Sequence, residues 1–384
     1  MNEAQKSFLQ AVSAAIFPGQ GIPSVEITDD LILEASQQAV TALILPQNRP
    51  EALRITANNI RLVNVQKEVD QALQGIPYAV LKGLAAAIYY PEPLKRSLGD
   101  IDIIVAPKDF AKAYHALEKG GFAAEEALET DDRHLHFHKN GICIELHHRF
   151  AILNTKEQEE QLDGWIFEAL PSLERVSVAN CTFPILPQLL NGLVLLSHIN
   201  QHMESGLGVR QMIDWTLYVD QRLHDADWLA FQEKADLLGL TRLAKVASKW
   251  GQMYLGLSQS IFWCQEAEDD VCEKLLEYII ESGNFGGKYG VNDYAIRALS
   301  RGRSVGGIFK HLQNLGKRDW TLLQKYPWLS PFAWVYQAGK YMVKLLKARI
   351  PLRELLNDVK ESENRDELME AVGVSRRARR IQEQ

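Results

Sequence analysis

Two aspartates lie two residues apart in a stretch that is otherwise aliphatic. Residues 99–105 have the sequence GDIDIIV, and Pro107 follows shortly after them. A β-branched run between such breakers predicts a short buried strand. Because side chains alternate across a strand, Asp100 and Asp102 share one face. Two buried carboxylates repel each other unless a cation lies between them. The pattern therefore predicts a divalent metal site, and carboxylate oxygens of this kind suit Mg²⁺.

A β-hairpin is expected further along the chain. Residues 134–139 and 142–147 alternate in polarity and are joined by Asn140-Gly141, the dipeptide that favours a two-residue type I′ turn. This turn fixes the register, which pairs Lys139 with Ile142, His138 with Cys143, His136 with Glu145 and His134 with His147. One face then carries His134, His136, His138, Glu145 and His147, and the apolar face carries Leu135, Phe137, Ile144 and Leu146.

The histidines of this hairpin allow two interpretations. Their imidazole nitrogens could bind Zn²⁺ or Mn²⁺, with His134, His136 and His147 as accessory ligands near Glu145. The cross-strand pair of Glu145 and His136 would also suit a general base. A polar sheet face in contact with water explains the same pattern, and the sequence leaves both interpretations open.

The elements around these residues predict an α+β fold. Residues 1–75 show the periodicity of amphipathic helices and form the predicted N-terminal helical segment. Residues 76–184 form the core, a small mixed β-sheet with helices, in which a strand at 78–81 leads into Lys82-Gly83 and a short helix. Residues 185–384 form a larger all-helical C-terminal domain, with helices predicted at 186–203, 209–223, 228–239, 241–254 and 266–282.

Composition and charge disfavour several classes of function. With 384 residues, of which 46% are hydrophobic, the chain can bury sizeable cores. A net charge of −7 and a pI near 5.9 do not favour binding to nucleic acid or to an anionic membrane. The four cysteines lack C-x-x-C spacing, so neither a zinc ribbon nor a disulfide framework is expected. No signal peptide or membrane span is recognised, and we expect a cytoplasmic protein.

Several short motifs together resemble a known group of enzymes. They are Leu81-Lys82-Gly83 after a strand, Arg96 ahead of Gly99-Asp100-Ile101-Asp102, Glu145 on a later strand, and the segment from His198 to Asp214. The arrangement is similar to the nucleotidyltransferase superfamily related to DNA polymerase β, and more closely to a bacterial subgroup of uncharacterised nucleotidyltransferases. The resemblance covers residues 78–220. One departure is that Lys-Gly replaces the usual Gly-Ser or Gly-Gly, at a longer interval before the first aspartate.

The resemblance implies Mg²⁺-dependent transfer of a nucleoside monophosphate from an NTP, ATP in the first place, to a hydroxyl of a small molecule or protein. It implies that Asp100 and Asp102 hold Mg²⁺, with Mn²⁺ as an alternative, and that Glu145 completes a second metal site and helps to deprotonate the acceptor. Nucleotide contacts are implied at Lys82, Gly83, Arg96 and Gly99, and along a helical wall made of His198, His202, Arg210 and Asp214. Lys82 and Arg96 could instead be ordinary surface and loop residues, and the polar residues of the wall could brace a helix pair.

Two rival functions stay open at this stage. The first is a metal-dependent phosphohydrolase built on the hairpin histidines, and the second is a non-catalytic nucleotide-binding module with the same fold. Residues 283–290 are rich in glycine but lack the Gly-Lys-Ser/Thr ending and the preceding strand of a phosphate-binding loop. We therefore predict a mobile loop there.

Overall fold

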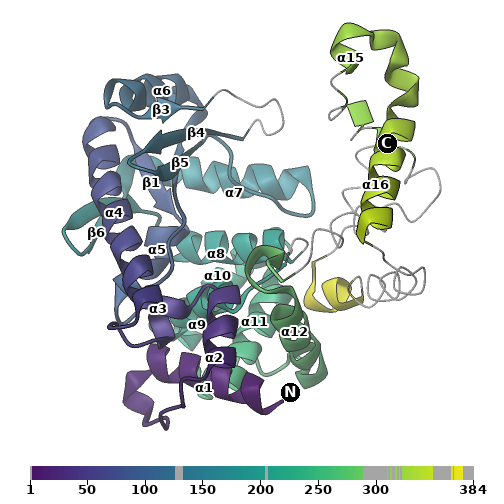
Figure 1. The fold of residues 1–384 in the computed structure, drawn as a ribbon. Coiled ribbons are helices and arrows are strands. Elements are labelled where there is room, and N and C mark those ends of the chain that lie inside the picture. Colours follow the sequence, from purple (N-terminus) through teal and green to yellow (C-terminus); the bar gives the residue numbers. More distant parts are fainter. Residues whose placement is uncertain are drawn as a thin grey trace. The chain divides into compact units, whose positions relative to one another are not determined.

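In a computed structural model the chain forms two compact units (Figure 1). The first comprises residues 1–286 and 371–384, and the second comprises residues 287–370. The structure describes residues 2–125, 133–203 and 206–288, with parts of 309–348 and of 365–374. Among these residues no helix is both long and apolar enough to cross a membrane.

The first unit begins with the predicted helical segment. Its helices are α1 (Glu3–Ile16), α2 (Asp29–Gln37), α3 (Thr41–Ile44) and α4 (Pro50–Ala72). The Asn2 side chain accepts a hydrogen bond from the Gln5 backbone, and Thr28 does the same for Leu31, so both α1 and α2 begin at a capped turn. Pro50 starts α4, where its fixed φ and missing N–H fit the first helical turn.

Seven strands of the described residues form one mixed sheet. They are β1 (Tyr78–Leu81), β2 (Asp100–Val105), β3 (Ala123–Ala124), β4 (His134–Lys139), β5 (Ile142–His147), β6 (Glu174–Val178) and β7 (Cys181–Ile185). Their order is β3-β4-β5-β2-β1-β7-β6. The pairs β2–β5 and β1–β7 are parallel and the other pairs are antiparallel. The α+β fold expected from the sequence is confirmed. In the sequence, helices come both before the first strand of the sheet and after its last strand.

The β4–β5 hairpin has the predicted register at every pair. Lys139 lies opposite Ile142, His138 opposite Cys143, His136 opposite Glu145 and His134 opposite His147. Asn140 and Gly141 have φ values of 52° and 75°, as a type I′ turn requires at both central positions. The turn chemistry therefore fixed which side chains share a face.

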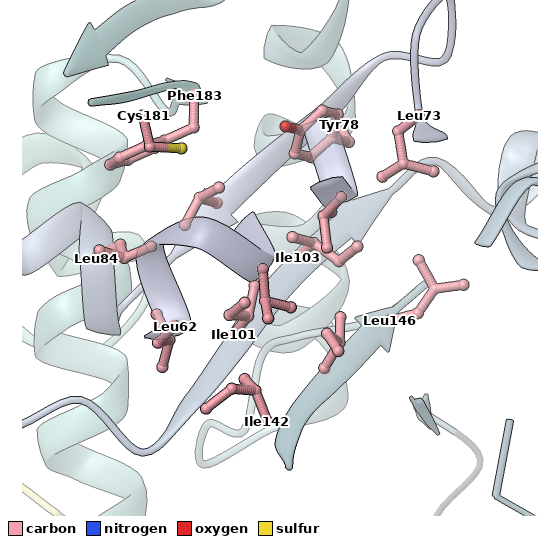
Figure 2. Close-up of a cluster of buried hydrophobic side chains, with 14 of the residues drawn as sticks. Leu62, Leu73, Tyr78, Leu84, Ile101, Ile103, Ile142, Leu146, Cys181 and Phe183 are labelled. Atoms are coloured by element: carbon pink, nitrogen blue, oxygen red, sulfur yellow. The ribbon is translucent and has the colours of Figure 1, made fainter. Parts of the chain in front are cut away.

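The apolar face of the sheet packs against α4 and α6 (Phe110–Lys119). Figure 2 shows Ile101 and Ile103 of β2 with Leu146 of β5 in this cluster. Leu62 of α4 and Leu117 of α6 are fully buried in the same core. Because Ile101 and Ile103 face this core, Asp100 and Asp102 must face the opposite side of the sheet.

Further helices continue the first unit. They are α5 (Gly83–Ala87), α7 (Lys156–Ala169), α8 (Gln188–His202), α9 (Val209–Arg222), α10 (Asp225–Leu237), α11 (Thr241–Tyr254) and α12 (Asp269–Ser282). Helices α8 to α12 match the five predicted after residue 185. Helix α7 and the β6–β7 hairpin were not predicted. The boundaries at residues 75 and 184 stay a prediction, and the predicted C-terminal domain extends beyond the described residues.

The second unit contains α15 (Leu322–Lys325), the 3₁₀ segment η6 (Pro327–Phe332) and α16 (Ala333–Ala348). The rings of Trp320 and Tyr336 stack with centroids 5.1 Å apart. The Gln313 side chain donates to the Ser330 carbonyl at 2.6 Å and accepts from the Trp334 N–H at 3.1 Å. These contacts join η6 and α16 to the segment that precedes them.

Candidate active site

Three carboxylates gather on the polar face of the sheet. Strands β2 and β5 run parallel, and their register places Asp102 directly opposite Glu145, with Asp100 two pairs away, opposite Cys143. One oxygen from each of Asp100, Asp102 and Glu145 lies within 4.8 Å of the other two. Asp102 is almost fully buried, with 2% of its surface exposed. The predicted strand and hairpin thus bring the three predicted carboxylates together.

The two aspartates have opposite electrostatic surroundings. The charge of Asp102, together with burial, raises the pKa of Asp100 to about 6. Burial alone would raise the pKa of Asp102, but contacts with Lys82 and His147 outweigh it and hold that pKa well below its usual value. The cluster therefore carries more negative charge than its neighbours neutralise. An all-oxygen donor set with this excess charge fits a hard divalent cation such as Mg²⁺.

Lys82 is held beside Asp102 by an unusual backbone conformation. It lies between β1 and α5 with φ 45° and ψ −124°, a region that residues other than glycine rarely adopt. Its Nζ is 2.8 Å from Asp102 Oδ1, and only 14% of its side chain is exposed. Burial would lower the pKa of Lys82, but the negative charges of Asp102, Asp100 and Glu145 raise it, so the ammonium stays protonated. Lys82 is therefore not a surface lysine.

His147 lies between two of the carboxylates. Its Nε2 is 3.1 Å from Asp102 Oδ1 and 3.3 Å from Glu145 Oε2. Burial would lower the pKa of His147, but hydrogen bonds to Asp102 and Glu145 raise it above its usual value. The side chains of His134 and His136 also approach Glu145, whereas His138 Nε2 is 3.1 Å from Glu125 Oε2. The polar face of the hairpin is thus a connected cluster of imidazoles and carboxylates.

A cavity of about 320 Å³ opens above the carboxylates. Its lining residues come from the β1–α5 turn, β2, the β4–β5 hairpin, helices α8 and α9, and the short turn η5 (Asn284–Gly286). They are Lys82, Gly83, Arg96, Gly99, Asp100, Asp102, Arg133, His134, Glu145, His198, Gln201, His202, Arg210 and Phe285. All these residues belong to the first unit.

The wall opposite the carboxylates comes from α8, α9 and η5. His198 and His202, one helical turn apart on α8, have their Nε2 atoms 2.9 Å apart. Burial lowers the pKa of His198 well below its usual value and that of His202 to about 3, so both are neutral at pH 7. The Arg210 guanidinium lies 5.2 Å from the centroid of the Phe285 ring, and the His202 ring lies 4.5 Å from it.

Comparison with known proteins assigns the chain to a family. Residues 32–249 match the model of a family described as "Uncharacterised nucleotidyltransferase". The chain belongs to this family. No curated protein matches the chain. The matched span contains the three carboxylates, Lys82 and the α8–α9 wall, and it ends before Phe285.

Membership of this nucleotidyltransferase family supports a transferase that acts on nucleoside triphosphates. The acidic cluster of Asp100, Asp102 and Glu145 could hold the divalent metal that such enzymes usually use. The predicted residues of the nucleotidyltransferase site mostly line one cavity. Asp214 is the exception on the helical wall, because it does not line the cavity and instead accepts hydrogen bonds from Arg96, which does.

The Arg96–Asp214 pair is a buried brace between the sheet region and α9. Arg96 Nε and Nη2 donate to the two oxygens of Asp214 at 2.8 and 2.6 Å. The Tyr90 hydroxyl donates to the same carboxylate at 2.7 Å. Arg210 Nη1 donates to the Ser97 carbonyl at 2.9 Å, and its buried Nε has no hydrogen-bond partner among the described residues. Arg210 therefore has more donor capacity left for a ligand than Arg96.

Sequence reasoning missed Arg133, Gln201 and Phe285 as cavity residues. Phe285 lies in the stretch predicted as a mobile loop, and it adopts a left-handed conformation with φ 56°. A β-carbon on Gly208 would lie 2.8 Å from the Asn284 Cα, so the start of α9 packs directly on this turn. The flanking glycines of Asn284–Gly286 were the available signal, but nothing in the sequence shows that α9 holds the turn against the cavity.

Proposed function

We propose that the chain transfers a nucleoside monophosphate from an NTP, ATP in the first place, to a hydroxyl group of a small molecule or protein. The observation that carries this proposal is the cluster of Asp100, Asp102 and Glu145 beside the buried Lys82 ammonium, at the base of a cavity. Family membership supports the reaction class. The acceptor oxygen would attack the α-phosphorus, the bond from that phosphorus to the pyrophosphate oxygen would break, and pyrophosphate would leave.

The carboxylates would hold Mg²⁺, which when bound neutralises the charge of the phosphates. Lys82 would add a second positive charge beside Asp102, and Arg210 would contact phosphate oxygens with its remaining donors. Glu145 would accept the proton of the acceptor hydroxyl, and His147 would orient that carboxylate from 3.3 Å. Gly83 and Gly99 leave the cavity open beside Lys82 and Asp100, where a side chain would compete with the phosphates.

The nucleobase would lie against Phe285. Phe285 is 42% exposed although it lines the cavity, so part of its surface is available to a ligand. His202 and Arg210 pack around it and fix its position. Aromatic rings stack on bases of every kind, which would give affinity without strong selection among the four NTPs.

The experiment that tests this function is a thermal-shift titration with each NTP, with and without Mg²⁺, combined with an assay for pyrophosphate. Ligand at a hundredfold excess over its Kd stabilises a protein by about 2.7 kcal/mol, which such a titration detects easily. We expect an Mg²⁺-dependent shift and a slow release of pyrophosphate, because water can replace the acceptor hydroxyl.

Asp102→Asn should remove both signals, and Asp30→Asn, which changes an exposed carboxylate on α2, should keep them. Circular dichroism checks that Asp102→Asn retains its secondary structure. Absence of any NTP effect on the wild type, or full turnover by Asp102→Asn, would refute the proposal.

A further inference from the structure

The hairpin histidines surround Glu145 at distances typical of ligands on one metal ion. The Nε2 atoms of His134 and His136 are 3.0 Å apart. His136 Nε2 is 3.6 Å from Glu145 Oε1, and His147 Nε2 and His134 Nε2 are 3.3 and 3.9 Å from Glu145 Oε2. A tetrahedral Zn²⁺ with bonds of 2.0–2.1 Å places its ligand atoms about 3.3 Å from one another. The four separations spread around this value, and one ligand atom from each of His134, His147 and Glu145 lies within 4.8 Å of the other two.

We propose that His134, His136, His147 and Glu145 form a transition-metal site, with Zn²⁺ as its ion, next to the Asp100–Asp102 pair. Three imidazole nitrogens and one carboxylate are ligands that Zn²⁺ accepts readily, whereas Mg²⁺ prefers oxygen ligands alone. Glu145 belongs to both clusters and would link the two sites. This proposal does not depend on nucleotidyl transfer, because its three imidazole ligands do not belong to the Asp100–Asp102–Glu145 cluster.

A carboxylate behind His136 supports the assignment. Glu125 Oε2 lies 3.4 Å from Nδ1 of His136, on the side of the ring away from Glu145. Histidines that bind a metal through one nitrogen usually donate the other N–H to a carboxylate or carbonyl, which fixes the ring and its tautomer. Glu125 would do this for His136.

The position of the cluster also suits metal entry. His147 is 7% exposed and His134 15%, whereas His136 is 40% exposed. The three histidines therefore extend from the buried carboxylates to the surface of the hairpin. An ion from solvent would meet His136 first and reach Glu145 and His147 without any rearrangement of the strands.

The proposal is tested by titrating the full metal-free chain with Co²⁺ and recording its visible absorption. Co²⁺ absorbs strongly in a tetrahedral site with nitrogen ligands and only weakly when six oxygens surround it. We expect one equivalent of Co²⁺ to give the strong band, Zn²⁺ to abolish it at stoichiometric amounts, and Mg²⁺ to leave it in place at a hundredfold excess over Co²⁺.

Variants on one strand provide matched controls. His136→Asn should weaken Co²⁺ binding by more than about a hundredfold. Glu125→Gln should weaken it by about ten- to a hundredfold, because Glu125 only orients His136. His138→Asn should keep the band, because its side chain is similarly exposed at 48% and contacts Glu125 rather than Glu145. Both His136 and His138 are partly exposed, so neither change threatens the fold.

Asp100→Asn separates this proposal from the proposed function. It removes a carboxylate of the Mg²⁺ cluster but none of the imidazole set, so it should abolish the NTP effect and retain the Co²⁺ band. Absence of a tetrahedral band in the wild type, equal loss in His136→Asn and His138→Asn, or displacement of the ion by Mg²⁺ would overturn the zinc site.

Discussion

At the scale of single residues, the neighbours of Asp100 and Asp102 shift the pKa values of these two carboxylates in opposite directions. Lys82 and His147 contact Asp102, and no ion pair of the described residues joins either of them to Asp100. The charge on Asp100 is therefore unfavourable in the metal-free protein, and its pKa of about 6 reflects this. A residue that destabilises the fold is retained for a ligand or a reaction.

Asp100→Asn should therefore stabilise the metal-free protein while it abolishes nucleotidyl transfer. Because the folded state raises the pKa of Asp100 from its model-peptide value near 4, the folded protein binds more protons than the unfolded chain between about pH 4 and pH 6, and stability falls as pH rises through this window. The gain from the substitution should reach up to about 3 kcal/mol at pH 8 and vanish at pH 4.

Urea denaturation in EDTA at pH 8 and at pH 4 measures this difference. Asp30→Asn, in an exposed position, is the control and should change stability little at either pH. A loss of stability at pH 8 would show that the Asp100 charge is compensated in the folded protein.

At the scale of elements, the turn η5 is positioned by the start of α9. Gly208→Ala would place a β-carbon 2.8 Å from the Asn284 Cα and 3.0 Å from the Asn284 Cβ, so the turn that carries Phe285 must move. We expect Gly208→Ala to weaken NTP binding to the same degree as Phe285→Ala, about tenfold. This is about 1.4 kcal/mol, within the roughly 1–3 kcal/mol that base stacking on an aromatic ring contributes.

Isothermal titration with ATP and with inorganic triphosphate measures this effect. Triphosphate lacks a base, so its affinity should stay near the wild-type value in both variants. Gly19→Ala, at a glycine with open space around it, serves as the control. An equal loss for triphosphate and ATP would contradict a role of Phe285 in base stacking.

The elements also show what the sequence could predict and what it could not. The Asn140-Gly141 turn fixed every pair of the β4–β5 hairpin, because a type I′ turn allows one register. The β6–β7 hairpin was missed because it turns at Ala179, whose left-handed φ of 51° is not typical of alanine. The Lys82–Asp102 and Arg96–Asp214 pairs join distant segments, and only the packed fold shows them.

At the scale of the whole molecule, the buried Arg96–Asp214 pair joins the sheet region to the C-terminal helices of the first unit. Both side chains are at most 4% exposed, and Tyr90 donates to the same carboxylate. Asp214→Asn leaves the Arg96 charge buried without its partner. We expect this change to lower the free energy of unfolding by about 3–5 kcal/mol.

Urea denaturation at pH 7 measures this loss, and the exposed ion pair of Lys274 and Asp270 gives the control. Asp270→Asn should change stability by less than about 1 kcal/mol, because exposed pairs contribute little. A similarly small change in Asp214→Asn would show that the Arg96–Asp214 pair does not hold the sheet region and the C-terminal helices of the first unit together.

The strained backbone at Lys82 determines when this side chain loses its conformational entropy, during folding or on ligand binding. A lysine side chain gives up as much as about 2 kcal/mol of rotational freedom when it is fixed in one conformation. Here the left-handed turn and Asp102 fix it during folding. The arriving nucleotide therefore meets an ammonium that is already immobile, and its binding energy is not spent on ordering this side chain.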